Sequence, residues 1–167
     1  MLAALAVDYA TERLDDALWS EVAPLLESHW HEVAHYDDLP LDPDRDRYAT
    51  IDANGGLRVF TARLAVPAPD RGRLIGYLAL FVVPSLHYRS SIFALQDVLY
   101  VDPLHRGSRA GIGLIRHAHN KLRAEGVTVI FQHVKARRDL NIGPVLQRLL
   151  GYELVDEVYA CRLDKES

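Results

Sequence analysis

Residues 97–113 bring two carboxylates, two arginines and three glycines into one short stretch. Asp97 lies in a run of β-forming residues, where a carboxylate is unusual and can take a proton from an amine. At the junction between that strand and an amphipathic helix stand Gly107, Gly111 and Gly113. These glycines let the backbone come close to a bulky anion. The stretch predicts a pyrophosphate site, although glycines that serve only helix packing would give the same spacing.

Arg106 and Arg109 stand beside these glycines and can add charge-assisted hydrogen bonds to a phosphate. An exposed turn would carry the same two arginines. The loop lacks the G-x-x-x-x-G-K-[ST] pattern and does not follow an initial strand, as a dinucleotide-binding loop does. We therefore expect neither a nucleotide-hydrolysing nor a hydride-transferring enzyme.

A second chemical pattern, HExxH, is formed by His31, Glu32 and His35. On a helix the two histidines would lie on one face and hold zinc, with the glutamate as general base. A third ligand is not evident, since no glutamate occurs between Glu32 and Glu125 and only aspartates lie nearby. A zinc hydrolase that uses these three residues is thus the alternative function.

The same helix end allows two other interpretations. It is either a solvated polar surface or one wall of a pocket for an acceptor molecule. The residues that would line such a pocket are Trp30, His31, Glu32 and Tyr36.

Composition and charge exclude several classes of protein. The 167 residues carry 19 Lys and Arg against 23 Asp and Glu, a net charge of -4, with no polybasic block to bind nucleic acid. The longest uncharged stretch, Leu74–Tyr88, contains Pro84 and is shorter than the about 20 residues that span a membrane. Cys161 is the single cysteine, so no internal disulfide can form. We expect a cytoplasmic protein that acts on neither nucleic acid nor membranes.

The periodicity predicts one mixed α/β domain over residues 1–167. Its first half supplies antiparallel hairpins and its second half a β-α-β-α-β succession, in which a helix connects two parallel strands. The expected helices are Thr11–His35, a short one toward Ile51, one that ends near Gly126, and Leu140–Leu150. The expected strands are Met1–Val7, Leu57–Val66, Arg73–Val83, Ser91–Val101, Val127–Val134 and one or two within Gly151–Leu163.

Val101-Asp102-Pro103 followed by Arg106–Gly113 resembles the GNAT superfamily of acyl-CoA-dependent N-acetyltransferases. That family's signature is a strand ending in Val-x-Pro and then Arg/Gln-x-x-Gly-x-Gly/Ala at the start of a helix. Asn141 and Leu149-Leu150-Gly151-Tyr152 resemble the family's later Asn and its Leu-Gly-Phe/Tyr, so the likeness covers nearly the whole chain.

The resemblance implies a fold and an activity. The fold would be a GNAT-like α/β (α+β) mixed sheet, with antiparallel N-terminal strands, flanking helices and a central parallel strand pair splayed around the acyl-CoA. Acetyl-CoA would be the co-substrate, and its acetyl group would pass directly to a primary amine of a small molecule or a peptide. The pattern from His29 to Tyr48 looks most like the small members found in phage and prophage genomes.

The resemblance also assigns residues to the acetyl-CoA. A backbone N–H near Leu99 or Tyr100 would polarise the thioester carbonyl. The residues that would bind the co-substrate are Leu99, Tyr100, Val101, Arg106, Gly107, Ser108, Arg109, Ala110, Gly111, Ile112, Gly113 and Asn141.

Asp97 is the expected general base, or the anchor of a water that carries the proton, with Glu32 and His133 as its competitors. The glycine loop departs from the family pattern, because it is one or two residues longer than usual. This length puts Ser108 where the family has Arg or Gln.

Gln147 stands where many members have a tyrosine that protonates the leaving thiolate, so water or Tyr152 would supply that proton. A non-catalytic acyl-CoA-binding protein of the same fold is therefore a further alternative. The sequence leaves the identity of the amine and the presence of a homodimer open.

Overall fold

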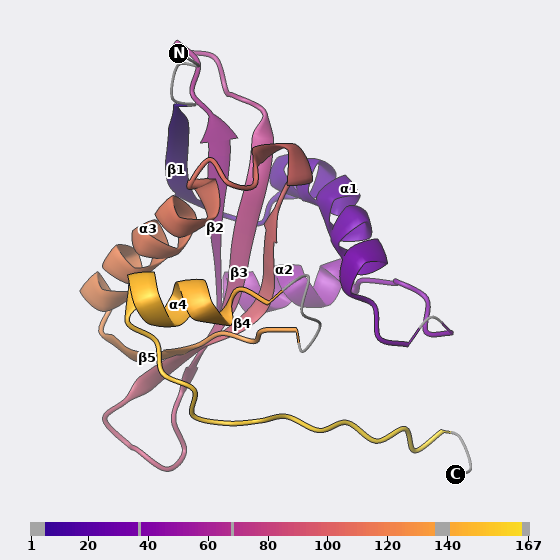
Figure 1. Ribbon diagram of the computed structural model, residues 1–167, viewed down its shortest axis with the longest axis vertical. Coiled ribbons are helices and arrows are strands. Elements are labelled where there is room, and N and C mark those ends of the chain that lie inside the picture. The colour runs from indigo at the N-terminus through magenta and orange to yellow at the C-terminus, as the bar shows by residue number, and fades with distance from the viewer. Residues whose placement is uncertain (1–5, 37, 68, 136–140, 165–167) are drawn as a thin grey trace. The chain divides into compact units, whose positions relative to one another are not determined.

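The computed structural model describes residues 6–36, 38–67, 69–135 and 141–164, and Figure 1 shows its helices and strands. The chain falls into two compact units, residues 1–133 and 134–167. The larger unit holds a sheet with helices on both faces, and the smaller unit holds one helix.

The sheet of the larger unit has five strands in the order of the sequence. Its first four strands pair antiparallel, and the last pair is parallel. This arrangement confirms the predicted mixed α/β fold with an antiparallel first half. The strands are β1 (Val7–Glu12), β2 (Leu57–Leu64), β3 (Leu74–Pro84), β4 (Ile92–Val101) and β5 (Val127–Phe131).

Helices cover both faces of the sheet, as Figure 1 shows. α1 (Asp16–Val33) and α2 (Arg45–Ala53) pack on one face, and α3 (Ala110–Ala124) packs on the other and connects the parallel strands. The strand β3 lies between these layers, which is why its residues 74–80 are all buried and apolar or glycine.

Capping aspartates fix the N-terminal ends of α1 and α2. The Asp15 carboxylate accepts the N–H of Leu18, and the Asp44 carboxylate accepts the N–H of Arg47. Pro24 lies inside α1 without splitting it. Residues 11 and 12, which the periodicity assigns to the helix, instead belong to β1, where they pair with β2.

A β-bulge interrupts β4 at Asp97. Val98 pairs with Ala79 and Gln96 pairs with Leu80, so Asp97 is an extra residue that opposes no residue of β3. In a regular strand, Asp97 and Val98 would point to opposite faces of the sheet. The bulge lets both side chains reach the face that α1 covers.

The parallel pairing of β4 with β5 covers only the first part of β4. The last matched residues are Leu95 and Phe131, and no described residue of β5 pairs with residues 96–101. The two strands therefore separate beyond Leu95, which is the splayed arrangement that the resemblance implies.

The smaller unit contains α4 (Gly143–Leu150). The Asn141 side chain accepts the N–H of Gly143 at the start of this helix, and Gly151 ends it in the left-handed conformation that favours glycine. The strands predicted within residues 151–163 are absent, because this segment forms no backbone ladder with any described residue.

Two other expectations concern the chain ends and membranes. The predicted first strand, Met1–Val7, lies mostly outside the described residues, and β1 begins at Val7. Among the helices of the described chain, none combines the length and the apolar character that crossing a membrane requires.

Candidate functional site

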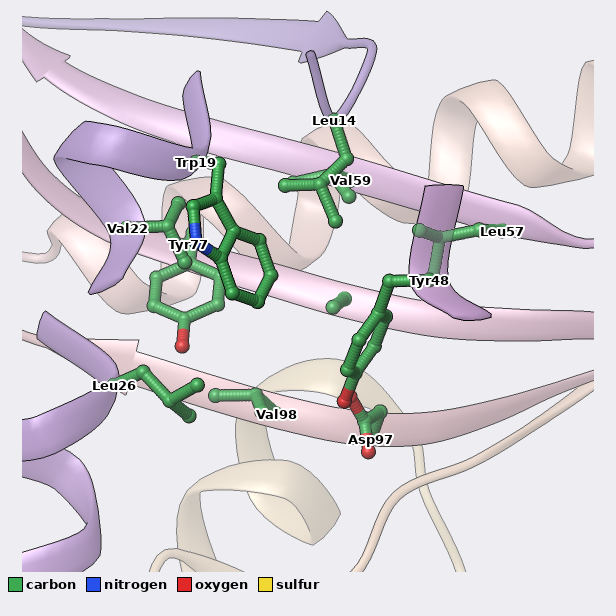
Figure 2. A pocket seen from close by; sticks show the side chains of 11 residues that line it. Leu14, Trp19, Val22, Leu26, Tyr48, Leu57, Val59, Tyr77, Asp97 and Val98 are labelled. Carbon is green, nitrogen blue, oxygen red and sulfur yellow. The ribbon is translucent and has the colours of Figure 1, made fainter. Parts of the chain in front are cut away.

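A narrow pocket opens between α1, α2 and the sheet, next to the bulge of β4 (Figure 2). Most of its wall is aliphatic or aromatic, and Asp97 brings the carboxylate. The lining residues are Leu14, Trp19, Val22, Leu26, Tyr48, Leu57, Val59, Tyr77, Ala79, Asp97 and Val98.

Tyr48 of α2 donates a hydrogen bond from its hydroxyl to Oδ2 of Asp97, with 2.5 Å between the oxygens. Burial raises the pKa of Asp97 above its ordinary value, and the hydrogen bond from Tyr48 partly opposes that rise. Burial and the neighbouring carboxylate raise the pKa of Tyr48, so its hydroxyl keeps its proton and remains a donor. Asp97 is thus a carboxylate that holds a proton more readily than an exposed aspartate.

Tyr77 of β3 adds a second hydroxyl to this pocket. Its side chain is only 2% exposed, and its Oη has no hydrogen-bond partner among the described residues. Burial and the negative charge of Asp97 raise the pKa of Tyr77. A buried hydroxyl without a partner is costly, so Tyr77 contributes its ring to the packing of the pocket while its hydroxyl destabilises the fold.

The glycine loop leads from β4 into α3 through a short 3-10 helix, Pro103–His105. Gly107 and Arg109 both have positive φ angles, of 88° and 67°. α3 then begins at Ala110 without any side-chain cap on its first N–H groups. These uncapped donors and the helix dipole favour an anion at this point.

Gly111 and Gly113 differ in what surrounds them. A Cβ on Gly111 would meet only Cγ2 of Val101, at an ordinary 3.5 Å. A Cβ on Gly113 would lie 2.1 Å from Oη of Tyr9, which is far closer than atoms can approach. Gly113 therefore has a packing role against β1, whereas a Cβ at Gly111 would fit without a clash.

Arg106 joins the glycine loop to α1. Its Nη2 donates to both carboxylate oxygens of Glu32, at 2.9 and 2.7 Å, and its Nε donates to the carbonyl of Val101 at 2.8 Å. The guanidinium also lies 5.6 Å from the ring centre of Tyr100. The structure thus pairs Arg106, a predicted ligand of the phosphates, with Glu32, which was predicted as an alternative general base.

The backbone of β4 offers an N–H on its splayed side. The N–H of Asp102 bonds to the carbonyl of Ile75, whereas the carbonyl of Val101 accepts from Arg106 instead. Backbone groups alternate sides along a strand, so Leu99 and Val101 point their N–H and carbonyl groups to the same side. The N–H of Leu99 therefore points away from β3, as the carbonyl of Val101 does. Leu99 therefore presents its N–H on the side where β5 has separated.

Buried side-chain amides lie near the same separation. The Oε1 of Gln96 and both polar side-chain atoms of Gln132 are buried without partners among the described residues. The Nε2 of Gln96 donates to the carbonyl of His133 at 3.5 Å. The His133 side chain itself is exposed.

The other predicted residues lie outside the pocket. Trp30 and His31 make an edge contact at 5.1 Å, and Tyr36 packs in the same way on His35 at 4.7 Å. The Ser108 hydroxyl donates to the carbonyl of His105. Ala110 is buried, Ile112 is half-buried, and Asn141 and the exposed Gln147 belong to the smaller unit.

The HExxH pattern does not form the predicted zinc-binding helix face. α1 ends at Val33, so His35 lies beyond the helix. Glu32 is held by Arg106. Within the described residues, no three His, Cys, Asp or Glu side chains are grouped as a metal site requires. The zinc-hydrolase alternative is therefore not favoured.

Sequence reasoning missed Trp19 and Tyr77 as site residues and gave Tyr48 no role. One signal was present, because Tyr48 and Ile51 are the large apolar residues of an otherwise polar short helix and lie three apart. That spacing places both on the buried face of α2. The position of Tyr77, which pairs with Tyr100 on β4, depends on strand register, which no local pattern shows.

Comparisons with known proteins agree with this geometry. The sequence model of the Acetyltransferase (GNAT) family matches residues 19–152. No curated protein matches. Nothing in these comparisons supports the narrower likeness to phage and prophage members.

Solved structures share the fold at low sequence identity. An aminoglycoside acetyltransferase, meta-AAC0020, from an uncultured soil metagenomic sample is 16% identical with a TM-score of 0.70, over 93% of this chain and 96% of its own. A predicted acetyltransferase with acetyl-CoA from Clostridium acetobutylicum is 16% identical with a TM-score of 0.71, over 95% and 97%. Ribosomal-protein-alanine N-acetyltransferase from Brucella melitensis biovar Abortus 2308 is 23% identical with a TM-score of 0.65, over 94% and 99%.

Proposed function

Because the chain belongs to the acetyltransferase (GNAT) family, we propose that it transfers an acetyl group from acetyl-CoA to a primary amine. One observation carries the proposal. The bulge turns the Asp97 carboxylate into a pocket, while Leu99, two residues further along β4, presents its N–H on the splayed side. A proton acceptor and a hydrogen-bond donor for a carbonyl thus stand side by side on one strand.

The residues of the glycine loop fit the phosphates of acetyl-CoA. The uncapped N–H groups of Ala110 and Gly111 can bind the pyrophosphate, since the space at Gly111 is open. Arg109 makes no ion pair with any described residue and is available to a phosphate. The unpartnered Oε1 of Gln96 and the unpartnered side-chain amide of Gln132 suit the two amide groups of the pantetheine arm.

Bound in this way, acetyl-CoA supplies an activated acetyl group, whose C–S bond breaks as the amine forms its N–C bond and whose sulfur leaves as a thiol. The residues of the chain transfer protons and stabilise the charge that develops. Asp97 accepts the proton that the ammonium must lose before it can attack. The N–H of Leu99 stabilises the negative charge that develops on the carbonyl oxygen. Water returns a proton to the sulfur, because an amide such as that of Gln147 cannot.

The nature of the acceptor is suggested by the structural neighbours. One aminoglycoside acetyltransferase was solved in complex with sisomicin, which is an amine of small molecular size. The Brucella neighbour is named for acetylation of a ribosomal-protein alanine. These names keep both a small-molecule amine and a peptide amine as acceptor classes for the present chain.

The experiment combines binding with turnover. Titration calorimetry should detect acetyl-CoA binding, and Gly111→Val should abolish it while the circular dichroism spectrum stays unchanged. Free-thiol release should then rise when amines are added to the protein and acetyl-CoA. A folded protein that does not bind acetyl-CoA would overturn the proposal. Binding without thiol release for any amine would favour the non-catalytic alternative.

A further inference from the structure

Six apolar side chains of β3, β4 and β5 form a strip on one face of the sheet. Residues paired across neighbouring strands point to the same face, and so do residues two apart along a strand. The strand register aligns two rows, which contain Phe81, Leu95 and Phe131 in one and Val83, Phe93 and Val129 in the next. The ring centres of Phe93 and Phe131 lie 5.5 Å apart, in agreement with a shared face. These six residues are the apolar strip.

The apolar strip belongs to the face that α1 and α2 cover, and part of it is open to solvent. Phe81 packs against the core beneath these helices, and its ring stacks on that of Tyr48 with 6.1 Å between the centres. Val83 and Val129 are 36% and 38% exposed, and the other four side chains of the strip are half-buried. Contiguous apolar surface of this kind marks a binding surface.

The apolar strip leads to the Asp97 carboxylate. Leu95 precedes Asp97 by two residues on β4, and the hydroxyl of Tyr48 donates to Asp97 while its ring stacks on Phe81 (Figure 2 shows the first contact). Leu95 and Phe131 are also the last matched residues before β4 and β5 separate. An acceptor whose body lies on the strip can therefore hold its amine next to the proposed base, where the two strands separate.

We propose that the acceptor is an arylalkylamine, with its aromatic ring on the apolar strip and its amino group at Asp97. This inference rests on the proposed N-acetyltransferase activity and narrows its substrate class. The rings of Phe81, Phe93 and Phe131 suit an aromatic body, because aromatic pairs in offset or edge-to-face contact gain more free energy than the buried area alone provides.

Two physical reasons disfavour a polyhydroxylated polyamine on the apolar strip. The six side chains carry no polar atom, so hydroxyl groups placed on them would lose water without gaining partners. The strip also offers no carboxylate as the counterion of a second ammonium, whereas Asp97 can serve the first. The inference separates this chain from its structural neighbours that carry the name aminoglycoside acetyltransferase.

A matched pair of amines tests the apolar strip. 2-Phenylethylamine and ethanolamine carry the same aminoethyl group, which bears an aromatic ring in the first and a hydroxyl in the second. With saturating acetyl-CoA, kcat/KM from thiol release should be at least about tenfold higher for 2-phenylethylamine, because only its ring is removed from water on the strip. It should also exceed the value for kanamycin. A value equal to or below that of either amine would overturn the inference and leave the acetyltransferase proposal standing.

Two neighbouring residues of β5 give a matched pair of variants. Phe131→Leu removes a ring from the apolar strip but keeps an apolar side chain, and should raise KM for 2-phenylethylamine about two- to tenfold. Ile130→Leu is the control, since Ile130 pairs with Ala94 and points to the opposite face, and it should leave KM unchanged. An unchanged KM in Phe131→Leu would overturn the placement of the ring. Should Phe131→Leu fail to fold, the ranking of the three amines on the wild type still decides the proposal.

Binding measurements separate this inference from the proposed function. Absence of acetyl-CoA binding would overturn the proposed function, whereas saturation-transfer NMR on the protein alone would still show whether 2-phenylethylamine binds and whether Phe131→Leu weakens that binding. Analytical ultracentrifugation tests the other occupant of an apolar surface, a second copy of the chain. A dimer that Val129→Glu dissociates, together with equal kcat/KM for 2-phenylethylamine and ethanolamine, would assign the apolar strip to that second copy and overturn the inference.

Discussion

The hydroxyl of Tyr48 and the carboxylate of Asp97 meet at 2.5 Å although they come from a helix and a strand 49 residues apart in sequence. The contact exists because α2 lies over the sheet beside the bulge of β4. Burial raises the pKa of Asp97, and the hydrogen bond limits that rise. Tyr48 therefore sets how readily Asp97 releases its proton, which is the property that decides the working pH of a base.

Asp97→Asn should lower kcat by roughly 10²–10⁴-fold, because an amide cannot accept the proton of the ammonium. Acetyl-CoA affinity should be retained, since Asp97 lies in the pocket rather than in the glycine loop. Steady-state thiol release and calorimetry measure the two effects. Full kcat in Asp97→Asn, with kcat lost in Glu32→Gln or His133→Ala, would assign the base to one of its competitors.

The same substitution should stabilise the fold near neutral pH. A pKa raised in the folded state means that folding favours the protonated carboxyl. The contribution of Asp97 to stability is then full below its ordinary value near 3.8 and declines as the pH rises through the raised folded value. Asp97→Asn removes this decline. Urea unfolding at several pH values should show a gain over the wild type that grows as the pH rises through that interval.

Tyr48→Phe should move the acid limb of the kcat profile to higher pH. Its hydroxyl stabilises the charged form of Asp97, so its loss raises the pKa of that carboxyl further. Activity that needs the deprotonated base then begins at a higher pH. Tyr88→Phe serves as the control, since that hydroxyl is remote from Asp97 in an exposed turn. An unshifted acid limb would exclude Tyr48 from tuning the base.

Much of the fold follows from local signals in the sequence. The β-forming residues of β2 and the uncharged run of β3 predict their strands, because both strands are largely buried. The helix starts were predicted less well: α1 begins after its N-cap Asp15 rather than at Thr11, because residues 11 and 12 pair with β2. The strands expected after Gly151 fail because a strand needs a partner, and β-forming residues alone do not specify one.

The sequence indicates candidate site residues only where one segment carries them. Asp97 and the glycine loop lie within a single stretch, and the sequence indicates both. The pairing of Glu32 with Arg106 joins residues 74 apart, so no pattern near either residue reveals it. The bulge that turns Asp97 into the pocket is a register shift between two strands, which the sequence of β4 does not show by itself.

The ion pair of Glu32 and Arg106 predicts opposite effects on acetyl-CoA affinity. Arg106→Gln should weaken binding if the guanidinium also serves the phosphates, as the resemblance implies. Glu32→Gln should strengthen it, because the released Arg106 can then turn toward a phosphate. Both changes should alter the free energy of unfolding by less than about 1 kcal/mol, as is usual for partly exposed ion pairs. Calorimetry and urea unfolding measure these quantities, and equal affinities in the two variants would mean that Arg106 serves only structure.

Gly111 and Gly113 should respond differently to the same added methyl group. Gly113→Ala forces a Cβ to within 2.1 Å of Oη of Tyr9, and such overpacking costs about 1–3 kcal/mol. Gly111→Ala meets only Cγ2 of Val101 at 3.5 Å and should leave stability unchanged or raise it by about 0.5–1 kcal/mol. Acetyl-CoA affinity should fall in Gly111→Ala, because the methyl group occupies space that a phosphate needs.

The double variant Tyr9→Leu with Gly113→Ala tests the cause of the instability. Removing the phenol relieves the clash, so the cost of Gly113→Ala should be smaller in the Tyr9→Leu background than in the wild type. Urea unfolding of the four proteins gives this coupling free energy directly. A cost that is independent of Tyr9 would show that helix geometry, rather than contact with β1, requires the glycine at position 113. Gly111→Ala with unchanged acetyl-CoA affinity would likewise remove the start of α3 from the phosphate site.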